Sequence, residues 1–139
     1  MSLAAILQGL NEQQMQAVTA PEGPVLVLAG PGSGKTRVLT HRIAWLVSQR
    51  GVLPSRIMAM TFTNKAAREM GRRVGELLAD NPRSVLMGTF HSICARFLRR
   101  EADRYLPITR DYVIFDTTDQ RALIKAIITE DLNLDEKRY

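Results

Sequence analysis

The feature that most constrains this chain is an apolar run ending in a glycine-rich loop, VLVLAGPGSGKT over residues 25–36. The loop fits the phosphate-loop pattern, with Ala29 in place of the first glycine. Glycines let the backbone curl so that successive N–H groups converge on a phosphate, at the positive end of the following helix. Lys35 brings a cation to the β- and γ-phosphates, and the Thr36 hydroxyl can ligate Mg²⁺. The segment therefore predicts binding of a nucleoside triphosphate.

The segments on either side of the loop have regular patterns. Residues 24–29 form a continuous apolar run, of the kind that a buried strand of a parallel sheet contains. From Thr36 to Gln49 apolar residues recur at helical spacing, and Gly51 is placed to end that helix. Because strand, loop and helix follow one another, a chance glycine-rich turn with an incidental lysine is the weaker interpretation.

Strand-like and helix-like segments continue to alternate along the chain. This alternation predicts an α/β fold with a wound parallel sheet flanked by helices. Further strands are predicted at residues 56–62, 85–90 and 112–116, and further helices within residues 9–20, 64–79, 91–106 and 116–130.

Polar residues at the predicted helix starts have the spacing of helix caps. Asn11 and Gln14 are three residues apart, as in a capping box, and so are Thr117 and Gln120. Asn64 stands where the cap of its helix belongs. We expect each of these helices to begin at its capping residue.

The composition is that of a basic globular domain. With 139 residues, 45% of them hydrophobic, the chain can bury a core as one domain or as part of a larger one. A net charge of +5 and a pI near 9.9 suit an acidic partner such as nucleic acid. The single cysteine, Cys94, excludes an internal disulfide and is expected in the core. No run reaches the roughly 18 apolar residues of a membrane span, so we expect a soluble cytoplasmic protein.

Several stretches, taken in order, resemble the opening motifs of superfamily 1 DNA helicases of the UvrD, Rep and PcrA type. The likeness runs from Leu10 onward and implies a P-loop NTPase with a RecA-like fold. By resemblance, residues 1–110 form the N-terminal part of the first RecA-like ATP-binding domain, and residues 111–139 begin an inserted helical subdomain. The stretches are LNEQQMQAV, LAGPGSGKTRVLTHRIAWL, MTFTNKAAREM, GTFHSICARFLRR and FDTTDQRALIK.

The resemblance implies an ATP site. Gln14 looks like the glutamine that recognises the adenine edge, and Arg37 is similar to an arginine that packs on the adenine face. Lys35 and Thr36 are implied as catalytic residues, with Thr36 on Mg²⁺. The implied phosphate cradle consists of Ala29, Gly30, Pro31, Gly32, Ser33, Gly34, Lys35 and Thr36.

The resemblance also implies a track for single-stranded DNA. Phe62 would stack on a base, Thr63 and Asn64 would reach the DNA backbone, and His91 would lie near a phosphate. From the residues alone, other interpretations stay open. Phe62 could end a buried strand, Asn64 could simply cap a helix, and His91 could be an ordinary surface residue.

The implied activity is that of an ATP-dependent DNA helicase, using ATP and Mg²⁺ and moving 3′ to 5′ along single-stranded DNA. The chain is expected to be an N-terminal fragment with little turnover alone. One alternative is a self-contained P-loop nucleotide kinase, with Asp116 on Mg²⁺ and Arg99 or Arg100 on the acceptor phosphate. We favour a different role for Asp116, capping the last helix together with Asp119. A third interpretation is a non-catalytic nucleic-acid-binding module.

Overall fold

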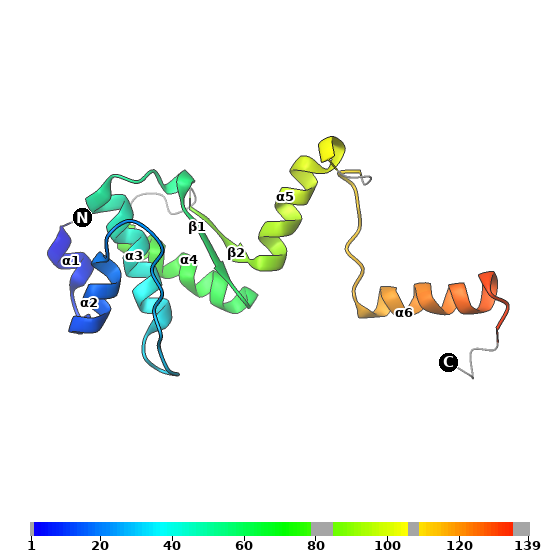
Figure 1. Ribbon diagram of the computed structural model, residues 1–139, viewed down its shortest axis with the longest axis horizontal. Helices are drawn as coiled ribbons and strands as arrows, with labels where there is room; N and C mark the ends of the chain where they lie inside the picture. The colour runs from blue at the N-terminus through cyan, green and yellow to red at the C-terminus, as the bar shows by residue number, and fades with distance from the viewer. Residues whose placement is uncertain (1, 79–84, 106–108, 135–139) are drawn as a thin grey trace. The chain divides into compact units, whose positions relative to one another are not determined.

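The computed structural model describes residues 2–78, 85–105 and 109–134. The chain forms two compact units, residues 1–96 and residues 97–139, and each is described by itself. The first unit holds the glycine loop, a small sheet and most of the helices (Figure 1).

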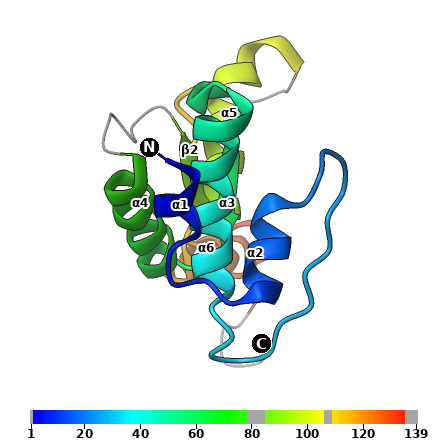
Figure 2. The ribbon, with the colours of Figure 1, turned by 90° about the vertical axis from the view of Figure 1, so that its left-hand side faces the viewer.

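In the first unit a central helix is packed between others. Helix α3 contacts α1, α2 and α4, and Figure 2 shows α3 with α2 on one side and α4 on the other. The helices are α1 (Leu3–Leu7), α2 (Glu12–Thr19), α3 (Lys35–Arg50) and α4 (Asn64–Leu78), with a short 3₁₀ turn η1 (Pro54–Arg56).

The sheet consists of two parallel strands joined by a crossover through α4. Strand β1 (Met58–Thr61) pairs with β2 (Leu86–Thr89), in a register that runs from Met58 opposite Leu86 to Thr61 opposite Thr89. Helix α4 packs on both strands, as a crossover helix between parallel strands does. The predicted α/β class and the strands predicted at residues 56–62 and 85–90 are thereby confirmed.

Two clusters of buried side chains hold this unit together, and α3 contributes to both. Ala44 and Trp45 face the first cluster, while Ile43 faces the second. The first is completed by Ile6, Leu10 and Val18, and the second by Ala59, Met70, Val74 and Val85. Removal of these apolar side chains from water is the main force that fixes α3 between the N-terminal helices and the sheet.

A polar contact adds to the first cluster. The buried His41 side chain of α3 has its Nδ1 atom 2.5 Å from the carbonyl oxygen of Ile6, to which it donates a hydrogen bond. Ile6 itself is fully buried in α1. The short α1 helix is therefore tied to α3 by both apolar packing and a hydrogen bond.

The strands predicted at residues 24–29 and 112–116 are wrong, since the structure has loop in both places. A β-strand needs a neighbour that accepts and donates its backbone hydrogen bonds. Among the described residues only β1 and β2 pair as strands. Leu26 and Leu28 are accordingly 84% and 88% exposed. An apolar run thus marks a segment suited to a sheet, but does not supply the partner strand.

The predicted caps are correct in one case and wrong in two. Asn11 and Gln14 form the predicted capping box of α2. Helix α4 is capped by Thr63, whose hydroxyl accepts a hydrogen bond from the Ala66 amide at 3.1 Å, and Asn64 is already the first helical residue. Both corrections have the same cause, because the cap is the residue before the one that we predicted.

The second correction lies in the second unit. Helix α6 (Thr117–Ala126) is capped by Asp116, whose carboxylate accepts from the amides of Thr118 (2.7 Å) and Asp119 (2.9 Å). Asp119 returns the bond to the Asp116 amide, which completes a capping box. The Thr117 and Gln120 pair is therefore not the box, whereas the capping role favoured for Asp116 is confirmed.

The remaining elements are helical. Helix α5 (Phe90–Tyr105) follows β2 directly, and α6 continues into a π-helical turn, η3 (Ile127–Asp131). Cys94 is exposed on α5, so the expected burial of its side chain is wrong. Within the described ranges, no helix has the length and apolar character needed to cross a membrane.

The packing makes a testable distinction between two large apolar side chains of the first unit. Met70 is fully buried in the second cluster, whereas Phe62 is 90% exposed. We expect Met70→Ala to lower the free energy of unfolding by about 2–5 kcal/mol, because it leaves a cavity in the core. Phe62→Ala should change it by less than about 0.5 kcal/mol. Urea denaturation followed by circular dichroism measures both, and equal losses would contradict the described packing.

Candidate nucleotide site and nucleic-acid face

The glycine loop is joined to α2 through the side chain of Gln14. The Gln14 Nε2 atom donates to the Ser33 carbonyl oxygen at 3.0 Å. At the other end of the same amide, Oε1 accepts from the Asn11 backbone N–H at 3.1 Å. The capping box at the start of α2 therefore also fixes the orientation of the Gln14 amide against the loop.

Lys35, the first residue of α3, reaches back over the loop. Its Nζ donates to the carbonyl oxygens of Ala29 (3.2 Å) and Gly30 (2.7 Å). The Ser33 hydroxyl donates to the same Gly30 carbonyl at 2.7 Å. The cation is thus held by neutral oxygens, and negatively charged phosphate oxygens would form stronger hydrogen bonds with it.

Two glycines give the loop its shape. Gly32 and Gly34 have φ angles of 74° and 81°, a left-handed conformation that other residues rarely adopt. Gly34 is the N-cap residue of α3, and a Cβ atom there would lie 2.8 Å from Gln14 Nε2. No acidic side chain lies in the first turn of α3, so the positive end of its dipole faces the loop without a competing charge.

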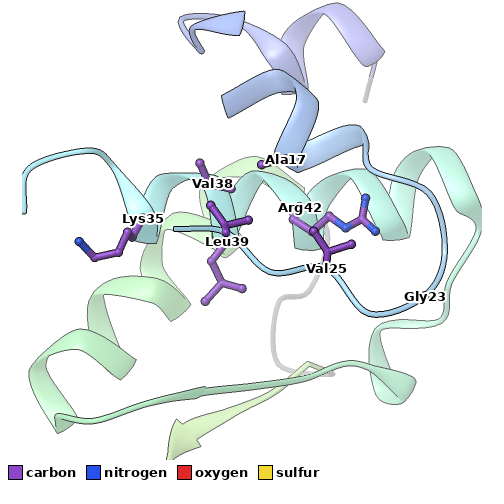
Figure 3. A pocket seen from close by; sticks show the side chains of 8 residues that line it. Ala17, Gly23, Val25, Lys35, Val38, Leu39 and Arg42 are labelled. Carbon is purple, nitrogen blue, oxygen red and sulfur yellow. The ribbon is translucent and has the colours of Figure 1, made fainter. Parts of the chain in front are cut away.

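Gln14 and Lys35 line one cavity of about 280 Å³ between α2, the loop and α3. Its mixed polar and apolar walls provide both hydrogen-bonding groups and apolar surface for a small organic ligand. A second, more apolar cavity of about 380 Å³ shares Lys35 with it and extends along α3 to Arg42 (Figure 3). The first cavity is lined by Asn11, Gln13, Gln14, Ala17, Val27, Leu28, Ala29, Gly30, Ser33, Lys35 and Val38.

The structure places the other predicted nucleotide residues differently. Arg37 donates from Nη2 to the Gln8 carbonyl at 3.4 Å and lines a separate hollow between α3 and α4, not the cavity that contains Gln14. Thr36 is half-buried in the first turn of α3, while Pro31 and Gly32 are exposed in the loop. Gln14, the loop and Lys35 are therefore brought together, and Arg37 points elsewhere.

The predicted nucleic-acid residues follow the carboxyl ends of the two strands. We call this surface the strand-end face and define it by Phe62, Thr63, Asn64, Phe90 and His91. Phe62 is 90% exposed, which excludes the alternative that it ends a buried strand. Asn64 and His91 are also exposed, in the first turns of α4 and α5.

Phe90 is a member of the strand-end face that sequence reasoning missed. The Phe62 and Phe90 rings lie 5.7 Å apart between centroids, with their planes tilted by 42°. Both residues follow the last register pair, Thr61 opposite Thr89, so the sheet itself places them side by side. The dipeptide Thr-Phe at the end of both predicted strands was the signal that could have found Phe90.

Two helices begin at this same edge of the sheet, each capped by a threonine hydroxyl. Thr63 caps α4, and the Thr89 hydroxyl accepts from the Ser92 amide at 3.1 Å in the first turn of α5. The first turns of both helices are free of acidic residues. The positive ends of two helix dipoles therefore lie beside the exposed Phe62 and Phe90 rings.

Further along α4, arginines are paired within the helix. Arg72 and Arg73 donate to the Glu69 carboxylate at 2.7 and 2.8 Å, and Arg72 also pairs with Glu76. Hydrogen bonds from Arg72 and then Arg73 lower the pKa of Glu69 to about 2. These two arginines are thus already neutralised locally, so Lys65 and Arg68 are better candidates for contacts with phosphates.

The residues proposed for a kinase are used in local contacts of the second unit. The Asp116 carboxylate caps α6, and the Arg99 guanidinium lies over the Tyr112 ring at 5.1 Å. Arg100 lies over Phe97 at 5.2 Å and pairs with Glu101. In the parts of the chain that the structure covers, no three His, Cys, Asp or Glu residues are grouped to hold a metal ion. Nothing in these contacts favours the kinase alternative.

Comparison with known proteins gives one consistent result. Residues 10–139 match the family model described as the UvrD/REP helicase N-terminal domain. The chain is 50% identical over 135 residues to the ATP-dependent DNA helicase PcrA of Staphylococcus aureus and to that of Staphylococcus epidermidis. These alignments cover 97% of this chain but 18% of each relative, so the chain spans less than a fifth of their length.

The glycine geometry predicts a difference between two alanine variants of the loop. Gly34→Ala places a residue with a Cβ atom in a left-handed backbone conformation and brings that atom close to Gln14. We therefore expect a loss of about 1–2 kcal/mol in stability. Nucleotide affinity should fall with it. Gly30→Ala is the matched control, because its φ is not positive and its Cβ would meet open space. Thermal unfolding and nucleotide titration of both variants check this, and equal effects would rule out the described loop.

Proposed function

This chain belongs to the UvrD/REP helicase N-terminal domain family, and on that premise we propose that it forms the N-terminal ATP-binding part of a DNA helicase. The proposed motor hydrolyses ATP with Mg²⁺ and moves 3′ to 5′ along single-stranded DNA. The observation that carries the proposal is the joint lining of one cavity by Gln14 and Lys35, with the Gln14 amide bonded to the loop.

Gln14 is proposed to recognise the adenine base. A glutamine amide has two N–H donors and an oxygen with two lone pairs. The contacts with Ser33 and Asn11 use one donor and one lone pair and leave one of each. A glutamine amide can accept from adenine N6 and donate to N7 through such a pair of groups. The existing hydrogen bonds would preorganise the amide for the base, so that little side-chain conformational entropy is lost on binding.

The loop and Lys35 are proposed to hold the phosphates. The residues present fit this role, since left-handed glycines shape the loop and a lysine cation has only carbonyl partners to give up. Mg²⁺, when bound, would neutralise charge on the β- and γ-phosphates, and Thr36 is the residue proposed to ligate it. The start of α3 adds a favourable dipole for the same anion.

The strand-end face is proposed to bind single-stranded DNA. Phe62 offers an almost fully exposed ring, and the neighbouring Phe90 ring, at the start of α5, lies beside it. Aromatic faces stack on any base, which suits a motor that must pass along unrelated sequences. Asn64, His91, Lys65 and the starts of α4 and α5 are proposed to face the DNA backbone.

In the whole protein, ATP would lie between this part and a second RecA-like domain, and closing and opening of that cleft would drive stepping along the strand. This chain spans 18% of the length of its PcrA relatives. We therefore propose that it binds ATP through one side of the cleft and turns it over slowly or not at all when alone.

The nucleotide proposal predicts a clear effect of Lys35→Ala. Loss of the charge-assisted bonds to phosphate should weaken ATP binding by about tenfold or more. Fluorescence titration with a labelled ATP analogue measures affinity, and a phosphate-release assay with and without single-stranded DNA measures turnover. Unchanged affinity in the variant would refute the proposed phosphate site. Turnover stimulated by a nucleoside monophosphate would instead indicate the kinase alternative.

The DNA proposal predicts that aromatic residues of the strand-end face matter more than others of similar exposure. Phe62→Ala should weaken binding of an oligo-dT strand by about 1–3 kcal/mol, since a stacking surface is lost. Phe90→Ala should give a smaller loss in the same assay. The control is Phe115→Ala, which removes from the second unit a ring about as exposed as that of Phe90. Fluorescence anisotropy measures affinity over a salt series, and equal losses in all three variants would contradict the proposal.

A further inference from the structure

One side chain of α3 holds the C-terminal end of α2 in place. The Arg42 Nη1 atom donates to the Val18 carbonyl at 2.8 Å and also to the Ala20 carbonyl, and Nη2 donates to the Pro21 carbonyl at 3.2 Å. The last carbonyls of a helix have no partner within the helix, and they form the negative end of its dipole. The cationic fork of Arg42 binds the Val18 carbonyl in the last turn of α2, the Ala20 carbonyl of its C-cap residue and the Pro21 carbonyl just beyond. Figure 3 shows Arg42 directed toward the loop that leaves α2.

The guanidinium of Arg42 is fixed in turn by its surroundings. It lies over the Trp45 ring at 4.8 Å, and Arg50 lies over the same ring at 5.6 Å. Arg50 also pairs with Glu22, just beyond the end of α2, at 2.7 Å. Burial, and then the charge of Arg50, lower the pKa of Arg42 from its usual value. A group that is partly desolvated beside a like charge is kept there by its carbonyl partners.

Helix α2 is therefore attached to the nucleotide loop and α3 at two points. At its start, Gln14 donates to Ser33 in the loop. At its end, three carbonyls are held by Arg42, which lies seven residues after Lys35 on α3. Helix α2 has eight residues, which is little more than two turns. The two attachments at its ends therefore fix where Gln14 lies relative to Lys35.

We propose that Arg42 is a positioning residue for base recognition, acting by holding α2 so that the Gln14 amide lies at the correct place above the phosphate loop. This inference rests on the proposed function, because it takes Gln14 as the residue that reads adenine. Arg42 touches neither base nor phosphate in this role. Its loss should therefore reduce selectivity for the base more than affinity for the phosphates.

The test measures the affinities of three ligands for the 139-residue chain and for its Arg42→Gln variant. ATP and inosine triphosphate differ at the 6-position of the base, where an amino donor is replaced by an oxygen acceptor, and inorganic triphosphate reports on the loop alone. We expect the preference for ATP over inosine triphosphate to fall by about fivefold or more, the value of one well-placed base contact. Affinity for inorganic triphosphate should stay within about twofold, because Lys35 and the loop are untouched.

The matched control is Arg50→Gln, which removes the other cation from the Trp45 ring but none of the bonds to the α2 carbonyls. Its base preference should equal that of the unmodified chain. Arg42→Lys keeps a donor for the carbonyls and serves if Arg42→Gln does not fold, with an intermediate preference expected. An unchanged preference in the folded Arg42 variants, or an equal loss of all three ligands, would overturn the inference.

A double-mutant cycle separates positioning from general stabilisation. If Arg42 acts through Gln14, Arg42→Gln should have no further effect on base preference in a Gln14→Ala background. Additive effects in the cycle would contradict the inference. Failure of the proposed function would look different. In that case the unmodified chain would show no preference for ATP, or Lys35→Ala would bind inorganic triphosphate as well as the unmodified chain does.

Discussion

The packing of α3 from two sides is the constraint on which the rest of the structure depends. Its N-cap residue, Gly34, belongs to the loop, so the position of the loop depends on the position of the helix that follows it. Ala44 and Trp45 bury one side against the N-terminal helices, and Ile43 buries another against α4 and the sheet. Apolar burial thus orients the helix, and its dipole and Lys35 then face the cavity beside α2.

The two candidate sites use one principle of this fold. Each lies at the N-terminus of one or more long helices, so backbone N–H groups and a positive dipole end are available for phosphates. The sites differ in the side chains that lie beside the helix N-terminus. At α3 a lysine and a glutamine amide converge on a cavity, which suits a single nucleotide. At α4 and α5 two exposed rings lie on an open surface, which suits a single strand of DNA that must move past them.

Sequence reasoning predicted the parts of this arrangement that depend on near neighbours. The capping box of Asn11 and Gln14, the glycine loop and the strands on either side of α4 follow from local patterns, and the structure has them. It failed where a partner distant in the sequence decides the outcome. Residues 24–29 are apolar but have no strand to pair with among the described residues. The roles of Arg42 and Phe90 depend on α2 and on the sheet register, which no local pattern reveals.

The central claim is that base and phosphates of one ATP molecule bind between α2 and the start of α3. Nuclear magnetic resonance of the ¹⁵N-labelled chain tests it directly during titration with ATP and Mg²⁺. We predict that the Gln14 side-chain amide and the backbone amides of the loop and Lys35 shift together, with one dissociation constant. Inorganic triphosphate should shift the loop with a smaller change at Gln14. Loop shifts without any response of Gln14 to ATP, or no response of either, would contradict the account.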